Sequence, residues 1–207
     1  MSDRMIDAVV FDLGNVLVGW DPYRPFVGRL PAREVEAFFT DLDFMAFNHH
    51  QDAGRSWADA RQELAASAPE HLPALDLYVA HFADTLVGPV PGSERLVRDL
   101  AALGVRLLGL TNWSAETFHL AEPAAPAIGL LEDVLVSGEV GVAKPDPRVF
   151  GLLTQRYGLD PRRTVFTDDS ATNVAAAAAS GFDALLFTSA DALRSDLAAR
   201  GLALPRT

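Results

Sequence analysis

The sequence predicts an α/β fold, a doubly wound parallel sheet with a small helical cap inserted after its first strand. Three observations favour this prediction. An apolar run over 8–11 leads directly into Asp12, the pattern from about 20 to 89 is helical without a convincing strand, and strand-like and helix-like segments alternate after residue 90. Continuous apolar strands are typical of parallel sheets covered on both faces, and strand–helix alternation is typical of βαβ units.

The size and composition of the chain fit one large domain, or one domain with a modest insertion. The 207 residues are enough to bury a sizeable core, and 49% hydrophobic with 22% charged residues is typical of a globular protein. The absence of cysteine excludes a disulfide framework, a thiol nucleophile and thiolate metal sites. It also fits a reducing compartment, and we therefore expect a cytoplasmic protein.

The net charge and the hydropathy pattern limit the partners. The formal net charge of −11 argues against nucleic acid or an anionic membrane as a partner. No stretch is long enough to span a bilayer, and Asp12 interrupts the N-terminal apolar run where a signal peptide would be uninterrupted. We expect a small-molecule partner, and a monomer or homodimer. An anionic substrate would need a local positive field, which Lys144, a metal ion and helix N-termini can provide.

The segment after the first strand predicts a series of helices. Pro31 precedes apolar residues at helical spacing, which is typical of a helix that begins with proline. Ser56, with Asp59 three residues later, is typical of a helix N-terminus. A further helix is expected over 72–87.

The Gly- and Pro-rich segment 88–92 predicts a linker at the end of this helical series. The helical series is therefore expected to be an insertion in the parallel-sheet domain. We expect the core of the protein to consist of residues 1–18 and 90–207, and the helical cap to consist of residues 19–89.

The second half of the chain predicts the remaining strands of the sheet. Residues 105–110 form a second buried strand, and 164–167 a third. Residues 134–142 are expected to form a short hairpin that leads to Lys144. The alanine run at 175–179 is expected to be a tightly packed helix, because alanine is the strongest helix former.

Asp12 is the most informative residue, because it follows a buried strand. Desolvating a carboxylate costs several kcal/mol, and the carboxyl ends of parallel strands are where ligands bind. Asp12 is therefore a metal ligand, a nucleophile or both, or else a turn residue that leaves the strand. Other polar groups follow in a fixed order, most of them at predicted strand ends: a hydroxyl with an amide, an ammonium and two carboxylates, at Thr111 and Asn112, Lys144, and Asp168 and Asp169.

This order and spacing over nearly the whole chain resembles the haloacid dehalogenase-like (HAD) superfamily of hydrolases. The segment Phe11-Asp12-Leu13-Gly14-Asn15-Val16 is most similar to the branch that contains bacterial α-glucose-1-phosphate phosphatases. The resemblance implies a Mg²⁺-dependent phosphatase of a small phosphorylated metabolite, one candidate being a sugar phosphate. It also implies that the helical cap covers the active site and selects the substrate.

The resemblance assigns roles to these residues. Asp12 would attack phosphorus and form an aspartyl-phosphate, and Mg²⁺, which needs only one or two carboxylates, would bind Asp12, Asp169 and the backbone carbonyl of Gly14. Thr111 and the Asn112 backbone would bind the transferring oxygens. Lys144 would pair with the phosphate and the nucleophile. Asn173 would hold Lys144 or a metal-bound water, and the residues expected to contact substrate are Asn15, Trp20, His49, Trp113 and Asn173.

Each of these residues also has a purely structural interpretation. Thr111 could cap a helix, Lys144 could be a solvated loop lysine, and Asn173 could face solvent. Asp168 is expected to support the metal ligands or cap a helix, since glycine is frequent at this position in the superfamily. Aromatic residues of the cap at helical spacing are more often core than binding site.

Gly14 departs from the pattern of most phosphatases of the superfamily, which carry a second Asp there as general acid and base. Such catalysis contributes roughly 10²–10⁴-fold. Either the leaving group departs with little help, or another group supplies the proton, with His49, His50 and Asp21 as candidates. The third account is that the reaction is not phosphoryl transfer.

That third account is a metal-independent 2-haloacid dehalogenase that uses Asp12 as nucleophile, because displacement of halide needs no acid. Asp169 argues against it, since a second carboxylate without a cation would repel both the nucleophile and an anionic haloacid. A non-catalytic ligand-binding homologue is the remaining alternative. The complete set of nucleophile, hydroxyl, lysine and metal-binding acid argues against that alternative.

Overall fold

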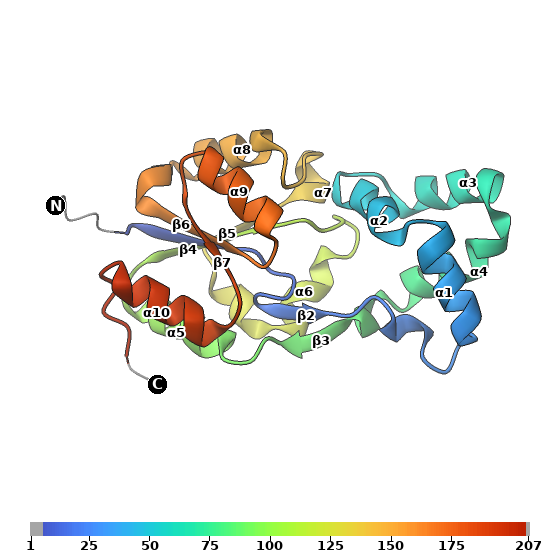
Figure 1. Cartoon of the computed structure of the whole chain (residues 1–207), viewed down its shortest axis with the longest axis horizontal. Helices are drawn as coiled ribbons and strands as arrows, with labels where there is room; N and C mark the ends of the chain where they lie inside the picture. The colour runs from blue at the N-terminus through green and yellow to red at the C-terminus, as the bar shows by residue number, and fades with distance from the viewer. Residues whose placement is uncertain (1–5, 206–207) are drawn as a thin grey trace.

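The parallel sheet has the predicted architecture. A computed structural model describes residues 6–205, and within this range one sheet has five parallel strands in the order β5-β4-β1-β6-β7 (Figure 1). The predicted α/β class with a helical segment after the first strand is therefore confirmed. The strands are β1 Ala8–Phe11, β4 Arg106–Thr111, β5 Asp133–Val136, β6 Thr164–Asp168 and β7 Asp183–Leu186.

Helices cover both faces of the sheet (Figure 1). Val9 and Phe11 of β1 belong to one hydrophobic cluster, with residues of α5 and α10, while Val10 belongs to the other, with residues of α8 and α9. Successive side chains of a strand point to opposite faces, so β1 must be apolar throughout to fill both layers. The helices are α5 Ser93–Ala102, α8 Pro147–Tyr157, α9 Ala171–Ala179 and α10 Ala190–Ala199.

The helical cap lies beyond one end of the sheet (Figure 1). The α3 helix begins where the sequence predicts, because the Ser56 hydroxyl accepts a hydrogen bond from the Asp59 backbone N–H at 3.0 Å. Rings of the cap, among them Phe38, Phe44 and Tyr78, pack on one another in its interior. The elements are η1 Arg24–Phe26, α1 Ala32–Asp41, α2 Phe44–Asp52, α3 Trp57–Ser67, η2 Pro69–His71, α4 Leu72–Ala80 and η3 Phe82–Thr85.

The prediction that the segment from about 20 to 89 contains no strand is wrong at both ends of that segment. β2 Val18–Trp20 pairs antiparallel with β3 Leu86–Pro89, and the helix expected over 72–87 ends at Ala80. Val90 N–H donates to the Leu17 carbonyl at 3.0 Å, so the chain leaves and re-enters the core at neighbouring points. These strands are too short for a periodicity signal, and their pairing partner is distant in sequence.

The hairpin expected over 134–142 is also wrong. β5 pairs parallel with β4, and the chain then turns into a short helix, α7 Ser137–Val140. Gly138 allows this turn, because a Cβ there would lie 2.6 Å from the backbone nitrogen of Ala115. The remaining elements are η4 Phe118–Leu120, α6 Ala121–Ala124, η5 Pro126–Leu130 and η6 Pro161–Arg163.

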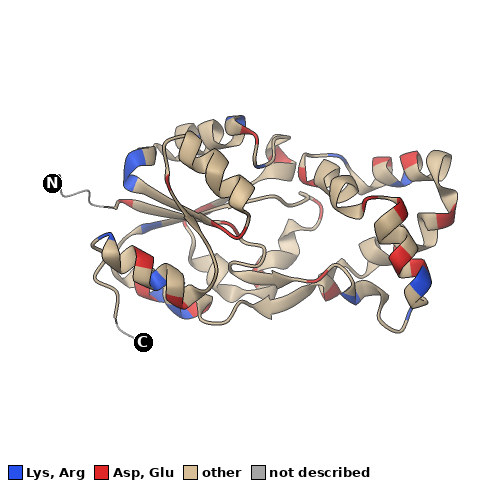
Figure 2. Ribbon diagram, in the orientation of Figure 1, with Lys and Arg blue, Asp and Glu red and all other residues tan. Residues whose placement is uncertain are grey.

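Charged residues are distributed over both the cap and the core helices, with acidic residues also at the centre of the molecule where strands of the sheet end (Figure 2). Across residues 6–205, none of the helices combines the length and the apolar character needed to cross a bilayer.

Candidate active site

The strand order places the predicted site residues at one point of the sheet. From β1 the chain passes to β4 and β5 on one side, and then to β6 and β7 on the other side. Ligand sites of open α/β sheets lie at the carboxyl ends of the strands at such a reversal. Asp12 directly follows β1, Thr111 ends β4 and Asp168 ends β6, so the three residues share this edge.

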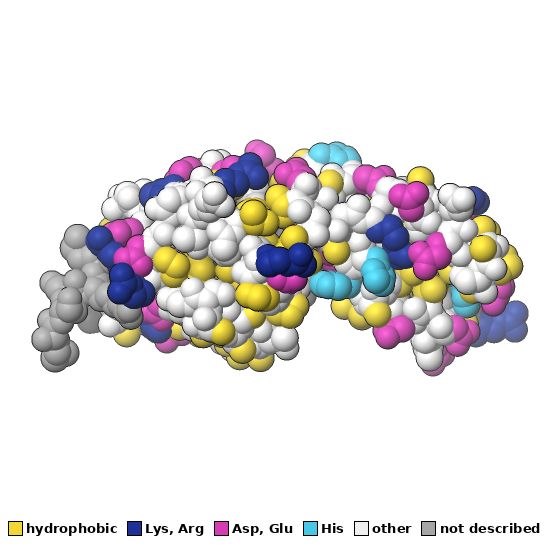
Figure 3. Space-filling model, turned by 90° about the horizontal axis from the view of Figure 1, so that it is seen from above, with side chains coloured by type: hydrophobic (Ala, Val, Ile, Leu, Met, Phe, Trp, Pro, Cys, Tyr) yellow, Lys and Arg dark blue, Asp and Glu magenta, His cyan; other side chains and the backbone are white. Residues whose placement is uncertain are grey.

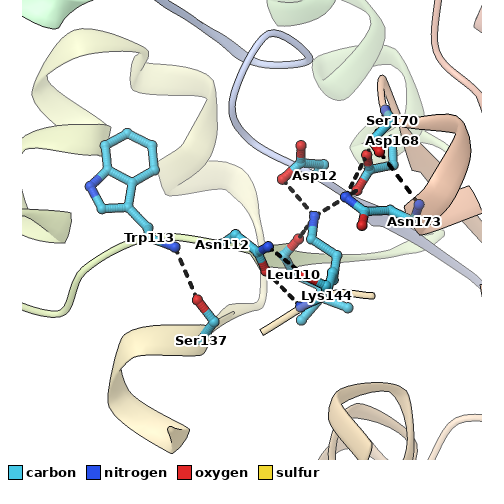
Figure 4. A network of polar contacts seen from close by, with 9 residues as sticks. All are labelled: Asp12, Leu110, Asn112, Trp113, Ser137, Lys144, Asp168, Ser170 and Asn173. Atoms are coloured by element: carbon cyan, nitrogen blue, oxygen red, sulfur yellow. Dashed lines mark hydrogen bonds and ion pairs between the residues drawn. The ribbon is translucent and has the colours of Figure 1, made fainter. Parts of the chain in front are cut away.

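A buried lysine joins these strand ends (Figure 4). The ammonium of Lys144, which is 1% exposed, lies 2.8 Å from Oδ1 of Asp12 and 2.6 Å from Oδ2 of Asp168. It also donates to the carbonyl of Leu110 at 2.9 Å. Three acceptors occupy the three hydrogens of the ammonium, so its orientation is fixed. Lys144 pairs with Asp12 as expected, but its second charged partner in this structure is Asp168.

Asn112 fixes the backbone that carries this lysine. Its Nδ2 donates to the Lys144 carbonyl at 2.8 Å, and its Oδ1 accepts from the Lys144 backbone N–H at 2.8 Å. This reciprocal pair ties the loop before α8 to the end of β4. The side chain of Asn112 therefore positions Lys144.

Asp168 accepts hydrogen bonds from several donors. Besides Lys144, its Oδ1 accepts from the Ser170 backbone N–H at 2.8 Å, and Nδ2 of Asn173 lies 3.1 Å from each of its two oxygens. The side chain of Asp168 is fully buried. Asn173 therefore contacts Asp168 and not Lys144, and it is absent from the described residues that line the cavity below.

Burial and charge perturb the ionisable groups of the site. Burial, with the charge of Asp168, outweighs Lys144 and raises the pKa of Asp12 to about 7. Burial and Asp168 also raise the pKa of Asp169. Burial opposes the charge of Lys144, but the two carboxylates outweigh this effect and raise its pKa. The site therefore holds more negative charge than its lysine balances.

The donor set fits a magnesium ion. Carboxylate oxygens of Asp12, Asp168 and Asp169 all lie within 4.8 Å of one another. The oxygens of Asp168 already accept from Lys144, Ser170 and Asn173, which leaves Asp12 and the exposed Asp169 to bind a cation. Mg²⁺ is commonly bound by one or two carboxylates and several waters. Asp12 and Asp169 are the pair that the sequence predicts.

A cavity of about 310 Å³ opens beside Asp12, between the core and the cap. The molecular surface is indented between the core and the cap, and histidine side chains lie near this indentation (Figure 3). The cavity is lined by several of the residues singled out in the sequence: Gly14, Asn15, Trp20, His49, Asn112, Trp113 and Asp169. Thr111 and the proposed proton donors His50 and Asp21 are not among the described residues that line it.

Helix α2 contributes lining residues that were not predicted from the sequence. Met45, Asn48, His49 and Asp52 all face the cavity, and of these only His49 was expected there. Their spacing of three and four residues is that of one helix face, so the pattern was visible in the sequence. Only the docking of the cap shows that this face meets Asp12.

Two loops complete the wall. Asn15 has a left-handed backbone with φ of 55°, and its Oδ1 accepts from the Trp20 backbone N–H at 3.1 Å. Trp113 is held by its backbone N–H, which donates to the hydroxyl of Ser137 at 3.0 Å, and by its indole N–H, which donates to Thr117 at 3.1 Å. Both tryptophans that follow the predicted motifs therefore lie at the cavity in defined positions.

The site thus combines an aspartate after the first strand of a doubly wound sheet, a buried lysine and a cluster of carboxylates, beside a helical cap. Residues 6–181 match the family described as haloacid dehalogenase-like hydrolase, and the chain belongs to that family. The resemblance of the motifs to this superfamily is thus confirmed.

Comparisons with individual proteins agree with this assignment. A phosphatase of Mycobacterium tuberculosis is 31% identical over 194 residues, which cover 87% of each chain. A HAD family enzyme of Bacteroides thetaiotaomicron, solved in complex with magnesium and inorganic phosphate, superimposes with a TM-score of 0.70 at 22% identity, over 89% of this chain and 95% of that one.

A dehalogenase has the same fold. L-2-haloacid dehalogenase from Xanthobacter autotrophicus, solved with chloropropionic acid covalently bound, superimposes with a TM-score of 0.65 at 20% identity, over 97% of this chain and 85% of that one. Some relatives are much longer: this chain spans 17% of a mouse acyl-CoA dehydrogenase family member and 36% of a drimenol cyclase of Aspergillus calidoustus.

Proposed function

We propose that this protein is a Mg²⁺-dependent phosphatase of a small metabolite that works through an aspartyl-phosphate on Asp12. The observation that carries the proposal is the charge of the site. Three carboxylates lie within 4.8 Å of one another, and Lys144 is the cation that contacts two of them. A divalent cation would balance this charge and would attract a phosphate dianion. The M. tuberculosis phosphatase and the magnesium and phosphate complex of the B. thetaiotaomicron enzyme support the same chemistry.

The chain's own residues prepare the nucleophile. Lys144 binds Oδ1 of Asp12, which leaves Oδ2 as the oxygen that attacks phosphorus. Asp168 and the Leu110 carbonyl hold the lysine in place, so Asp12 does not have to reorganise during the reaction. Magnesium bound by Asp12, Asp169 and the carbonyl of Gly14 would neutralise the charge that develops on the transferred group. Thr111 and the Asn112 backbone are proposed to bind its oxygens.

The cavity supports a small polar leaving group. Its volume of about 310 Å³ is at the lower end of ligand cavities. Aromatic side chains form much of its wall, and polar side chains such as Asn15, Asn48 and Ser114 line it as well. We propose a sugar phosphate, as in the α-glucose-1-phosphate phosphatase branch that the first motif resembles.

The dehalogenase alternative keeps one observation in its favour, which is the lack of an acid at Gly14. The raised pKa of Asp169 argues against it, because this carboxylate carries an electrostatic cost that a cation would relieve.

The test is a pair of assays with the purified protein. Phosphate release from an aryl phosphate and from a sugar-phosphate panel is measured with Mg²⁺ and with a chelator, alongside halide release from 2-chloropropionate. We expect phosphate release that the chelator abolishes, and no halide. Halide release that the chelator does not affect would show that the protein is a dehalogenase and not a phosphatase. If neither phosphate nor halide is released, a ligand-binding function is favoured.

A further inference from the structure

The cavity contains one carboxyl group that neither the metal nor the nucleophile accounts for. Asp52 is the last residue of α2, and it lines the cavity together with Asp12 and Gly14. Asp52 comes from the cap, whereas Asp12 follows the first strand of the core. No residue of the loop after Asp12 offers an acid, because Gly14 has no side chain.

Asp52 is held in place by the segment that follows it. Gly54 approaches the core so closely that a Cβ there would lie 3.4 Å from the carbonyl oxygen of Gly138. Three residues further along, the backbone N–H of Trp57 donates to Oε1 of Glu116 at 2.8 Å. These contacts join the segment after α2 to the core. The backbone that carries Asp52 is therefore fixed relative to the core.

The surroundings of Asp52 raise the pKa of its carboxyl group into the neutral range. Burial, with the charge of Asp12, outweighs Lys144 and a 3.3 Å hydrogen bond from Asn48, and raises the pKa of Asp52 to about 7. Its place at a helix C-terminus acts in the same direction, since the helix dipole disfavours a negative charge there. Arg55 does not neutralise it, because its guanidinium donates to Gln51, Glu63 and the Phe47 carbonyl.

The other titratable groups that face Asp52 are poorer proton donors. Tyr78 of α4 is fully buried, and burial raises its pKa far above the ordinary value. His49, on the same face of α2, is exposed to solvent. Asp12 and Lys144 are bound to each other.

We propose that Asp52 is the general acid and base of this enzyme, an inference that rests on the proposed phosphatase activity. As Oδ2 of Asp12 bonds to phosphorus, the bond from phosphorus to the leaving oxygen breaks, and this oxygen takes the proton of the Asp52 carboxyl. Water then attacks the aspartyl-phosphate and gives its proton to the Asp52 carboxylate. The bond between Asp12 and phosphorus breaks, which releases phosphate and restores both side chains.

The test separates the first chemical step from the second. The first turnover of p-nitrophenyl phosphate and of glycerol 2-phosphate is followed with Mg²⁺ for the native protein and for Asp52→Asn. An aryl oxygen can leave without taking up a proton, whereas an alkyl oxygen needs a proton in order to leave. We expect Asp52→Asn to slow the first turnover of the alkyl ester by about 10²–10⁴-fold and that of the aryl ester by less than about threefold. The steady-state rate falls for both esters, because the second step still lacks its base.

Asp43→Asn is the matched control. Asp43 lies at the other end of α2, is exposed and makes no side-chain capping bond, and its left-handed backbone suits asparagine. The pH profile of the native enzyme is a second readout: its alkaline limb for the alkyl ester is expected to disappear in Asp52→Asn.

Three results would overturn the inference while leaving the phosphatase intact. These are equal effects of Asp52→Asn on the first turnover of the two esters, no effect on either, or the same leaving-group selectivity in His49→Gln. A native protein that hydrolyses neither ester would instead overturn the proposed function, and the inference with it.

Discussion

Replacing Asp168 and Asp169 one at a time with asparagine gives two neighbouring isosteric changes with different expected effects. Asp168 accepts hydrogen bonds from Lys144, Ser170 and Asn173 and is fully buried. Asparagine has a single acceptor oxygen, so at least one of these donors would face its NH₂ group. An orphaned buried donor costs about 1–3 kcal/mol, and breaking a buried ion pair about 3–5 kcal/mol. Loss of the repulsion between Asp168 and Asp12 offsets part of this cost.

We therefore expect Asp168→Asn to lower the free energy of unfolding by about 2–4 kcal/mol. Asp169→Asn removes an exposed carboxylate whose pKa is raised, so its effect in metal-free buffer should stay within about 1 kcal/mol of zero. Urea denaturation followed by far-ultraviolet circular dichroism, in the presence of a chelator, measures both. Equal midpoints for the two variants would refute the argument, because the structure would then not distinguish the two carboxylates.

Four further predictions concern the metal, the nucleophile and the cavity. Asp12→Asn should abolish steady-state turnover while the protein stays folded, and an unchanged rate would exclude the proposed mechanism. Mg²⁺ should raise the melting temperature of the native protein but not that of Asp169→Asn, as scanning calorimetry can measure. The pKa of Asp52 is about 7 in the folded protein and 3.8 in its ordinary state, so the folded protein binds the proton more tightly than the unfolded chain. The free energy of unfolding of the native protein therefore falls as the pH rises from 3.8 to 7. Asp52→Asn should be more stable than the native protein by about 1–4 kcal/mol at pH 8 and equally stable near pH 4. A Cβ at Gly14 would have no neighbouring atom within 4 Å, so Gly14→Asp should fold. Because Asp52 already supplies the proton in the native protein, Gly14→Asp should there affect alkyl and aryl esters equally, and it should restore alkyl-ester hydrolysis in Asp52→Asn; selective acceleration of alkyl esters in the native background would mean that the native protein lacks an acid.

The sequence was sufficient to predict the α/β class and the strands that lead to Asp12, Thr111 and Asp168. The apolar run before Asp12 predicts a doubly covered strand, and Ser56 with Asp59 predicts the start of α3, because both signals are local. The strands β2 and β3 were not predicted, because a strand of three or four residues is too short to show an alternating hydrophobic pattern. Each of them also depends on a partner strand far along the chain.

The site was predictable where residues follow strands and not where they depend on docking. The consecutive acids at the end of β6 point in different directions, as side chains of a strand do, and only the structure shows that Asp168 is the one that meets Lys144. Asn173 was assigned to the same lysine but reaches the carboxylate between them. Asp52 has no motif at all, and its significance comes from the placement of α2 over Asp12.

The pairing of β2 with β3 makes the cap, in topological terms, a very long hairpin loop inserted at a single position. Its two ends are fixed next to each other, since the Ser93 hydroxyl donates to the Val16 carbonyl at 2.6 Å. Lengthening such a loop costs little closure entropy, so the sheet tolerates insertions of different length at this position. If Asp52 donates the proton, an exchange of caps between homologues would transfer part of the catalytic machinery together with the substrate preference. A chimaera with a foreign cap would then keep its nucleophile and lose its acid, unless an aspartate were restored at Gly14.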